Sequence, residues 1–183
     1  MIKSENKDQE INVIQGVAEK LPFPERYFSC VYSCEAAFHF YDKRTFIKET
    51  HRVLKEKGTL VIGDITKKSS APQNKIMEDY RNMLNAEEFF TREKYLDMIN
   101  DTFDRRPNID DITDKNIKYL THGSKLLLNI FEYIEKFPLL KIKMEEHLKK
   151  RGIDLPTFLE NIRTTKLSYG SSMVEYLKIH CVK

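Results

Sequence analysis

The chain has 183 residues and a mass of 21.7 kDa, the size of one domain with its own hydrophobic core. Its 31 Lys and Arg are interleaved with 28 Asp and Glu, so the formal charge of +3 is spread out and excludes the one-signed surface that binds nucleic acid. No apolar run approaches the roughly 20 residues of a membrane span. We therefore expect a soluble, cytoplasmic protein that binds neither nucleic acid nor a membrane.

The first part of the chain predicts two short strands. "EINVIQG" (Glu10–Gly16) is rich in β-branched residues, and two prolines in "AEKLPFPERY" then break the chain into a loop. "FSCVYSC" (Phe28–Cys34) is short and mostly apolar. Such a run suits a strand that is buried on both faces of a sheet.

A helix and a third strand follow. Asp42 is a natural N-cap, and apolar residues at helical spacing predict a helix from Asp42 to about Lys57, where Gly58 ends it. "TLVIGDI" (Thr59–Ile65) has strand composition. Residues 28–65 therefore predict two parallel strands joined by a helix, and the protein is expected to be α/β.

The remainder is mostly helical. Apolar spacing predicts helices around residues 76–84 and 95–103, and a short strand is expected within "RRPNIDDIT". Residues 113–165 again show helical spacing and predict an all-helical insertion within a single domain spanning residues 1–183. In the closing "MVEYLKIHCVK", apolar residues alternate with charged ones, which predicts an antiparallel strand near a sheet edge.

The three cysteines predict no metal or redox site. Cys30, Cys34 and Cys181 are odd in number and lack the C-x-x-C spacing of a zinc or dithiol motif. We expect them to be small buried hydrophobic residues in a reducing compartment.

The stretch "SCEAAFHFYDKR" (Ser33–Arg44) holds the candidate chemistry. Glu35 and His39 follow a predicted strand, and ligands of parallel sheets bind beyond the carboxyl ends of the strands. A histidine with a pKa near neutrality suits proton abstraction. The alternative is that His39 is a hydrogen-bonded packing residue and Glu35 caps a turn, while Phe38 and Phe40 belong to the core.

Residues Gly16–Ile65, "GVAEKLPFPERYFSCVYSCEAAFHFYDKRTFIKETHRVLKEKGTLVIGDI", resemble the middle of a class I S-adenosylmethionine-dependent methyltransferase of the small-molecule type. The family pattern is a G-D-A-E-x-L-P-F turn, a strand, a loop with E and H, a helix ending R-V-L-K-P-G-G, and a strand ending in D. The resemblance implies a Rossmann-like fold, S-adenosylmethionine as cofactor and a small-molecule substrate.

The resemblance also implies roles for particular residues. His39 would be the general base, and Glu35 would orient the substrate. The cofactor would contact Val17, Ala18 and Glu19 in the turn, and Ser33 and Cys34 at the end of the strand.

Two departures from the family pattern bear on cofactor binding. Val17 stands where the family has an aspartate that accepts a hydrogen bond from the adenine amino group. The sequence also contains no G-x-G-x-x-G loop. If Glu10–Gly16 is the family's third strand, the first two strands precede this chain. We therefore expect an incomplete Rossmann-like fold, a parallel sheet with an antiparallel last strand, in a fragment of a methyltransferase.

Two classes of function remain open. The first is methyl transfer to a small hydroxylated or amine metabolite, with O-methylation preferred over N-methylation of the phosphoethanolamine type, and with residues 113–165 forming part of a substrate cap. The second is a non-catalytic remnant or a partner-dependent subunit. A homo-oligomer and a complementing N-terminal half are the partners to consider.

Overall fold

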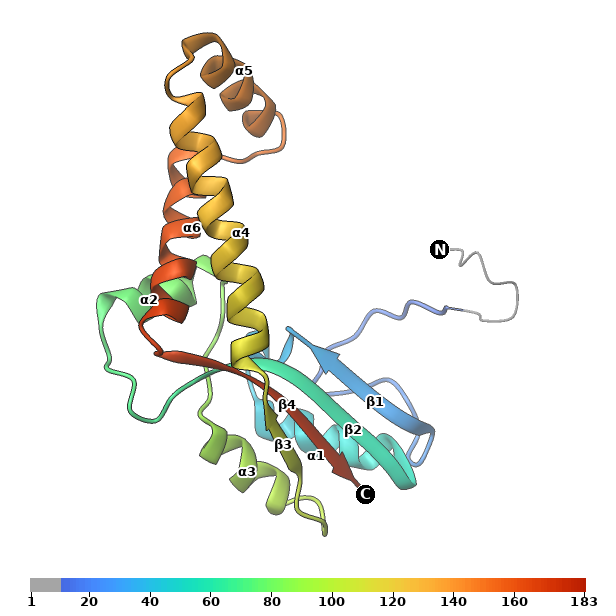
Figure 1. Cartoon of the computed structure of the whole chain (residues 1–183). Coiled ribbons are helices and arrows are strands. Elements are labelled where there is room, and N and C mark those ends of the chain that lie inside the picture. The colour runs from blue at the N-terminus through green and yellow to red at the C-terminus, as the bar shows by residue number, and fades with distance from the viewer. Residues whose placement is uncertain (1–10) are drawn as a thin grey trace.

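The computed structural model describes residues 11–183, and of residues 119–121 the backbone only. A four-stranded sheet of order β1-β2-β4-β3 forms its base (Figure 1). β1 (Phe28–Cys34) is parallel to β2 (Leu54–Lys67), whereas β4 (Val174–Val182) is antiparallel to both β2 and β3 (Asn108–Asp111). The expected α/β fold, its parallel pair and its antiparallel last strand are confirmed.

The helix between the parallel strands is shorter than expected. The 3₁₀-helix η1 (Ala37–His39) leads into α1 (Lys43–Val53), and the Asp42 side chain caps α1 as predicted by accepting from the Thr45 amide at 3.0 Å. The prediction that the helix continues to Lys57 is wrong. The carbonyls of residues 52 and 53 accept from the amides of residues 26 and 27, and Leu54 already pairs with Phe28. Tertiary pairing therefore replaces the last helical turn.

One face of the sheet carries the main core. Leu60 and Ile62 are two residues apart on β2 and therefore point to the same face. Both are fully buried against α1 and α3 (Arg92–Asn100), which lie behind the sheet in Figure 1. The other members of this core come from β4, α1, α3 and the segments beside them: Ala37, Phe46, Ile47, Leu54, Tyr95, Met98, Ile99, Phe103, Leu177, Ile179 and Cys181.

The opposite face of the sheet is open near β1. Tyr32 is 66% exposed, Cys30 and Cys34 are exposed, and Val61 on β2 is only half-buried. The prediction that β1 is buried on both faces is therefore wrong, as is the prediction of burial for these two cysteines; Cys181 is buried as expected. Among residues 11–183 no helix covers this part of the sheet, and β1 is an edge strand.

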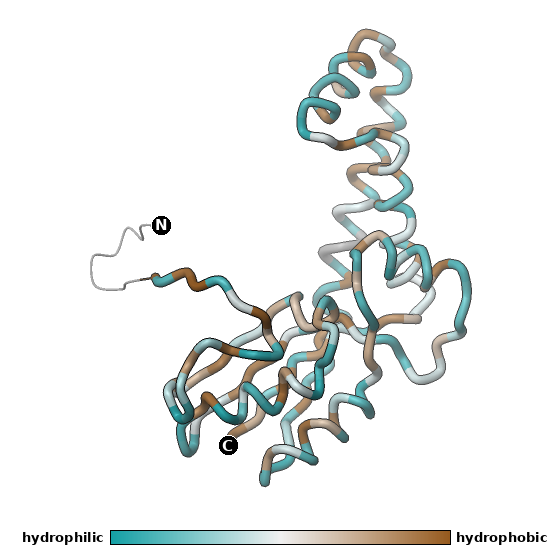
Figure 2. Tube along the Cα trace, turned by 180° about the vertical axis from the view of Figure 1, so that it is seen from behind, coloured by the Kyte–Doolittle hydropathy of each residue, from teal (hydrophilic) through white to brown (hydrophobic). Residues whose placement is uncertain are grey.

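The segment before β1 does not form the strand predicted for Glu10–Gly16. Glu10 lies outside the described residues, and residues 11–16 are extended chain without strand pairing, in which Val13 is 74% exposed. Figure 2 shows this segment leading away from the sheet. A strand forms only where a neighbouring strand pairs its backbone groups, and no such neighbour lies beside residues 11–16 in the described chain.

The next residues are held against α1. Arg52 donates to the carbonyls of Leu21 and Phe23, at 3.0 and 2.8 Å, and pairs with Glu49 at 2.7 Å. Glu49 in turn accepts from the Leu21 amide at 2.9 Å. These bonds satisfy backbone groups of a proline-containing loop that has no ladder of its own.

Helices rise from the carboxyl end of β2 and carry a projecting arm (Figure 1). α2 (Lys75–Met83) packs beside α6 (Leu155–Gly170), and α6 packs along α4 (Thr113–Ile134), while α5 (Pro138–Lys149) closes the tip. α4, α5 and α6 make up the arm, and they span most of residues 113–165, for which the sequence predicts helices. No helix of the described chain meets the length and apolarity needed to span a membrane.

We predict unequal costs for truncating neighbours on β2. Ile62→Ala should lower the free energy of unfolding by about 2–5 kcal/mol, because it empties a packed core position. Val61→Ala should cost less than half as much, since its side chain lies on the open face. Urea denaturation of both variants measures the difference, and equal losses would show that the face bearing Val61 is covered in solution.

Candidate functional site

The candidate site lies where β1 ends, beside Gly63 of β2, which itself continues to Lys67. The Glu35 amide donates to the Gly63 carbonyl at 2.8 Å, which extends the parallel ladder one residue beyond β1. Glu35 itself has a φ of 49°, in the left-handed region that non-glycine residues seldom adopt. The chain therefore leaves the sheet abruptly at Glu35 and enters η1, which carries His39. Both side chains are exposed.

The His39 ring is held in one orientation. Its Nδ1 lies 3.0 Å from the carbonyl oxygen of Asn85, and its ring packs on Phe38 at 4.3 Å between centroids. Because a carbonyl can only accept, Nδ1 carries the hydrogen, and Nε2 of the neutral ring is the atom that can accept a proton. Nothing in the sequence singled out Asn85, because its contribution comes from the backbone and from a loop 46 residues further on.

Glu35 faces a group of buried tyrosines. Burial raises the pKa of Tyr176, and the Cys34 thiol 3.8 Å from its hydroxyl and the Glu35 carboxylate raise it further. Burial also raises the pKa values of Tyr80 and Tyr169, with a smaller contribution from Glu35. The three phenols therefore stay protonated, and the Tyr176 hydroxyl lies beside Cys34 at the end of β1.

The five residues expected at the cofactor have different surroundings. Val17 is 60% exposed, Ala18 packs against the main core, and Glu19 accepts from the Asp42 amide at 3.2 Å, which holds the turn beside the start of α1. Ser33 is buried and its hydroxyl has no partner among the described residues, while the next side chain, Cys34, lies on the open face.

These observations test the fit of the expected cofactor. The unpartnered Ser33 hydroxyl and the exposed apolar Val17 lie beside the turn and the strand end, and they suit the polar and apolar parts of a nucleoside. Glu19 is engaged in holding the turn. The structure therefore brings Glu19, Ser33, Cys34, Glu35 and His39 to one end of the sheet and leaves Val17 at its margin.

Asp64 forms a buried polar cluster that the sequence did not predict. Its Oδ2 accepts from the Tyr95 hydroxyl at 2.5 Å, and its Oδ1 has no partner among the described residues. Burial raises the pKa of Asp64 to about 6, although Tyr95 and the charge of Lys43 act in the opposite direction. Lys43 is itself 2% exposed and donates to the Phe40 carbonyl at 3.2 Å.

The cluster lies beneath η1 and has no access to solvent. Tyr95 occupies an apolar helical position, and Lys43 begins an amphipathic helix, so local spacing gives no sign that either meets Asp64. The full burial of Asp64 favours a structural role for this cluster.

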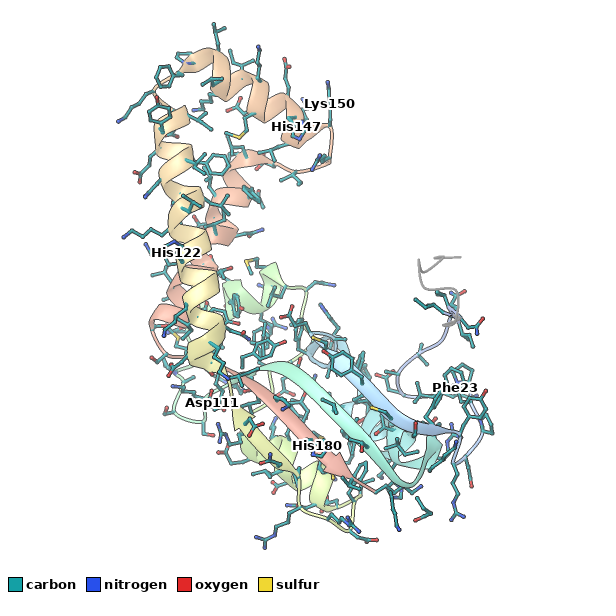
Figure 3. All side chains as sticks on the ribbon, turned by 45° about the vertical axis from the view of Figure 1, so that its right-hand side comes forward. Phe23, Asp111, His122, His147, Lys150 and His180 are labelled. Carbon is teal, nitrogen blue, oxygen red and sulfur yellow. The ribbon has the colours of Figure 1, made fainter. Side chains whose placement is uncertain are left out.

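Two hollows of the described surface lie away from these residues. One of about 640 Å³ lies beside α2 and is lined by residues such as Asn74 and Met77. Another of about 1020 Å³ lies beside α4, with Lys118 and His122 among its lining residues. Figure 3 shows His122 on the arm, far from the end of β1. Neither hollow includes Glu35 or His39.

Comparisons with known proteins agree with this geometry. Residues 1–62 match a family model described as a methyltransferase domain. The chain is 35% identical over 77 residues to the uncharacterized methyltransferase YcgJ of Bacillus subtilis (strain 168), covering 42% of this chain and 29% of that protein. It is 34% identical over 70 residues to the ubiquinone/menaquinone biosynthesis C-methyltransferase UbiE of Serratia proteamaculans (strain 568), covering 38% and 28%.

The fold has solved neighbours of the same kind. A phosphoethanolamine N-methyltransferase 2 of Haemonchus contortus aligns with a TM-score of 0.68 and 15% identity, over 91% of this chain and 36% of that one. The family model thus matches residues 1–62 only, about a third of the chain, and the solved neighbours share its fold at low sequence identity. The alignments span less than a third of the length of the two curated relatives.

We predict that Asp64 makes stability depend on pH. Its pKa in the folded state, about 6, is above the ordinary 3.8, so the folded protein binds more protons and loses stability as the pH rises from about 4 through 6. This loss amounts to about 3 kcal/mol, because a tenfold change in proton affinity is worth about 1.4 kcal/mol. Asp64→Asn should remove it.

The measurement is urea denaturation of both proteins between pH 4 and pH 7. The stability of Asp64→Asn relative to the native protein should increase across this range. The exposed Asp110, which pairs with Lys178 at 3.4 Å, supplies the matched control, and Asp110→Asn should leave the pH dependence unchanged. A constant difference between Asp64→Asn and the native protein would contradict the buried, raised pKa.

Proposed function

We propose that this protein transfers a methyl group from S-adenosylmethionine to a small hydroxylated or amine metabolite. The observation that carries the proposal is His39: its Nδ1 is held by the Asn85 carbonyl, and its Nε2 is left to accept a proton beyond the end of β1. This is the arrangement that a general base requires, in a chain of the methyltransferase family.

His39, Glu35 and Phe38 each have a separate role in the proposed reaction. Bound S-adenosylmethionine supplies an electrophilic methyl group on its sulfonium, and its product is S-adenosylhomocysteine. Nε2 of His39 accepts the proton that the acceptor's oxygen or nitrogen loses as it forms its bond to the methyl carbon. Glu35 hydrogen-bonds the acceptor or balances its charge and so aligns it for reaction. Phe38, which is 4% exposed, supports the ring of His39 from the core.

The proposed cofactor contacts come partly from this chain. Val17 and Ala18 would lie against the adenine, Glu19 would hold their turn, and Ser33 and Cys34 would line the end of the strand. The 183 residues contain no glycine-rich loop for the methionine end of the cofactor. We attribute those contacts to further polypeptide, an N-terminal half or another subunit, packed on the open face beside β1.

The acceptor class has two candidates. The sequence E-A-A-F-H of residues Glu35–His39 resembles that of O-methyltransferases, which favours a hydroxyl acceptor. N-methylation is favoured by a different observation: Glu35 is an exposed carboxylate just beyond the end of β1, where it can pair with a cationic amine. In either case the arm helices would form part of the cap over the acceptor.

We predict that residues 1–183 alone bind S-adenosylmethionine weakly or not at all, because this chain supplies only one side of the site. Isothermal titration calorimetry tests this, and micromolar affinity would contradict it. The protein at its natural length, with any subunit that copurifies, should bind the cofactor and methylate members of a hydroxylated or an amine panel. Binding without transfer to either panel would favour the non-catalytic alternative.

We predict that His39→Ala in the active protein lowers turnover by about 10²- to 10⁴-fold, the usual contribution of a general base. Its affinity for S-adenosylmethionine should change little, because the imidazole acts on the acceptor. His51→Ala, which removes a half-buried histidine in the last turn of α1, is the control and should retain full turnover per folded molecule. If His39 only packs, its variant should instead melt at a lower temperature with normal activity per folded molecule.

A further inference from the structure

The helix α2 ends in a turn with a left-handed residue. Asn85 follows the C-cap of α2 and has a φ of 49°. Its amide donates to the Asn82 carbonyl at 3.0 Å, and the Ala86 amide donates to the Arg81 carbonyl at 2.9 Å. These are the two bonds of a Schellman motif, which ends a helix by turning the chain at a single left-handed residue.

The same turn is bonded to η1 at two points. The Asn85 carbonyl accepts from Nδ1 of His39 at 3.0 Å. The Glu87 amide donates to the Phe38 carbonyl at 3.0 Å. Between these two points Ala86 is buried and belongs to the same core cluster as Phe38. One turn therefore holds both the ring of His39 and the backbone beside it.

The backbone conformation of Asn85 explains this contact, and its side chain does not. The side chain is exposed and makes no hydrogen bond or ion pair within the described part of the chain. Rotation about φ moves the carbonyl, so the left-handed φ determines where the Asn85 oxygen points. Asparagine adopts this conformation more readily than other residues except glycine, whereas β-branched residues seldom adopt it and proline cannot.

We propose that Asn85 is a positioning residue for His39, because its left-handed conformation aims the backbone carbonyl that keeps the ring hydrogen on Nδ1 and leaves Nε2 free to accept a proton. The hydrogen bond made by one ring nitrogen sets the tautomer of a neutral histidine. This inference deepens the proposed methyl transfer and rests on it for the role of His39 as a base. The placement of the ring itself can be measured without any activity.

The end of α6 supplies a matched control. Ser172 occupies the equivalent position after that helix, with a φ of 56°, and its amide donates to the Tyr169 carbonyl at 3.1 Å. The ring of His39 is bonded to the turn after α2 and not to this one. A substitution at Ser172 therefore creates the same conformational defect without removing the acceptor of the ring.

The first test is nitrogen NMR of the imidazole rings in the 183-residue chain, at a pH where they are neutral. The native protein and Asn85→Gly should carry the hydrogen of His39 on Nδ1, because glycine permits the left-handed φ. Asn85→Pro fixes φ near about −65° and should release the ring, so that the two tautomers mix. Proline is common just after helices, so α2 itself should persist. Ser172→Pro should leave the tautomer of His39 unchanged.

The second test is turnover of the active protein. Asn85→Pro should lower kcat by about 100-fold, as a displacement of about 1 Å in a reacting group can do, while the affinity for S-adenosylmethionine changes little. Asn85→Gly should keep the native turnover. In a His39→Ala background, Asn85→Pro should cost no further turnover, because it acts only through the ring.

The outcomes separate this inference from the proposed function. Circular dichroism establishes that each variant is folded, and Asn85→Val, which strains the left-handed φ, replaces Asn85→Pro if the latter is not. A native tautomer in that variant, or an equal change in Ser172→Pro, would overturn the inference. Loss of the tautomer in Asn85→Gly would also overturn it, because the side chain would then be responsible. A changed tautomer with native turnover in both Asn85→Pro and His39→Ala would establish the positioning and refute His39 as the base.

Discussion

The parallel pairing of β1 with β2 is the interaction on which the rest of the structure depends. From Cys30↔Thr59 to Cys34↔Gly63 the two strands run in register, and α1 crosses between them on one side. Because Cys34 pairs with Gly63, the pairing brings Glu35 and Asp64 to the same level of the sheet, where β1 ends. The bond from the Glu35 amide to Gly63 continues the ladder into the turn that presents His39. The candidate site is thus a consequence of strand register.

That same pairing leaves the sheet covered on one side only. α1 and α3 bury Leu60 and Ile62, while Tyr32 on the other face remains 66% exposed. A sheet of this kind normally buries both faces, so the exposed face and the edge of β1 are where further polypeptide can pack. The proposed catalytic residues Glu35 and His39 follow β1 directly and are exposed, and the surface proposed to complete a cofactor site is the open face.

The arm adds a second surface with a different character. The edge of the sheet at β1 presents backbone groups, which suit another strand, whereas the arm exposes apolar side chains such as Leu126 and Ile130 on α4. α6 links the arm to the tyrosines beside Glu35 through Tyr169.

The sequence by itself determined the features that depend on neighbouring residues: the bounds of β1, the Asp42 cap, the antiparallel last strand and the family resemblance of Gly16–Ile65. Tertiary structure decided what depends on distant residues. α1 ends at Val53 because residues 26 and 27 take its last carbonyls, and residues 11–16 form no strand because no strand lies beside them. The buried meeting of Lys43, Asp64 and Tyr95, and the tautomer of His39, likewise arise from contacts that local spacing does not encode.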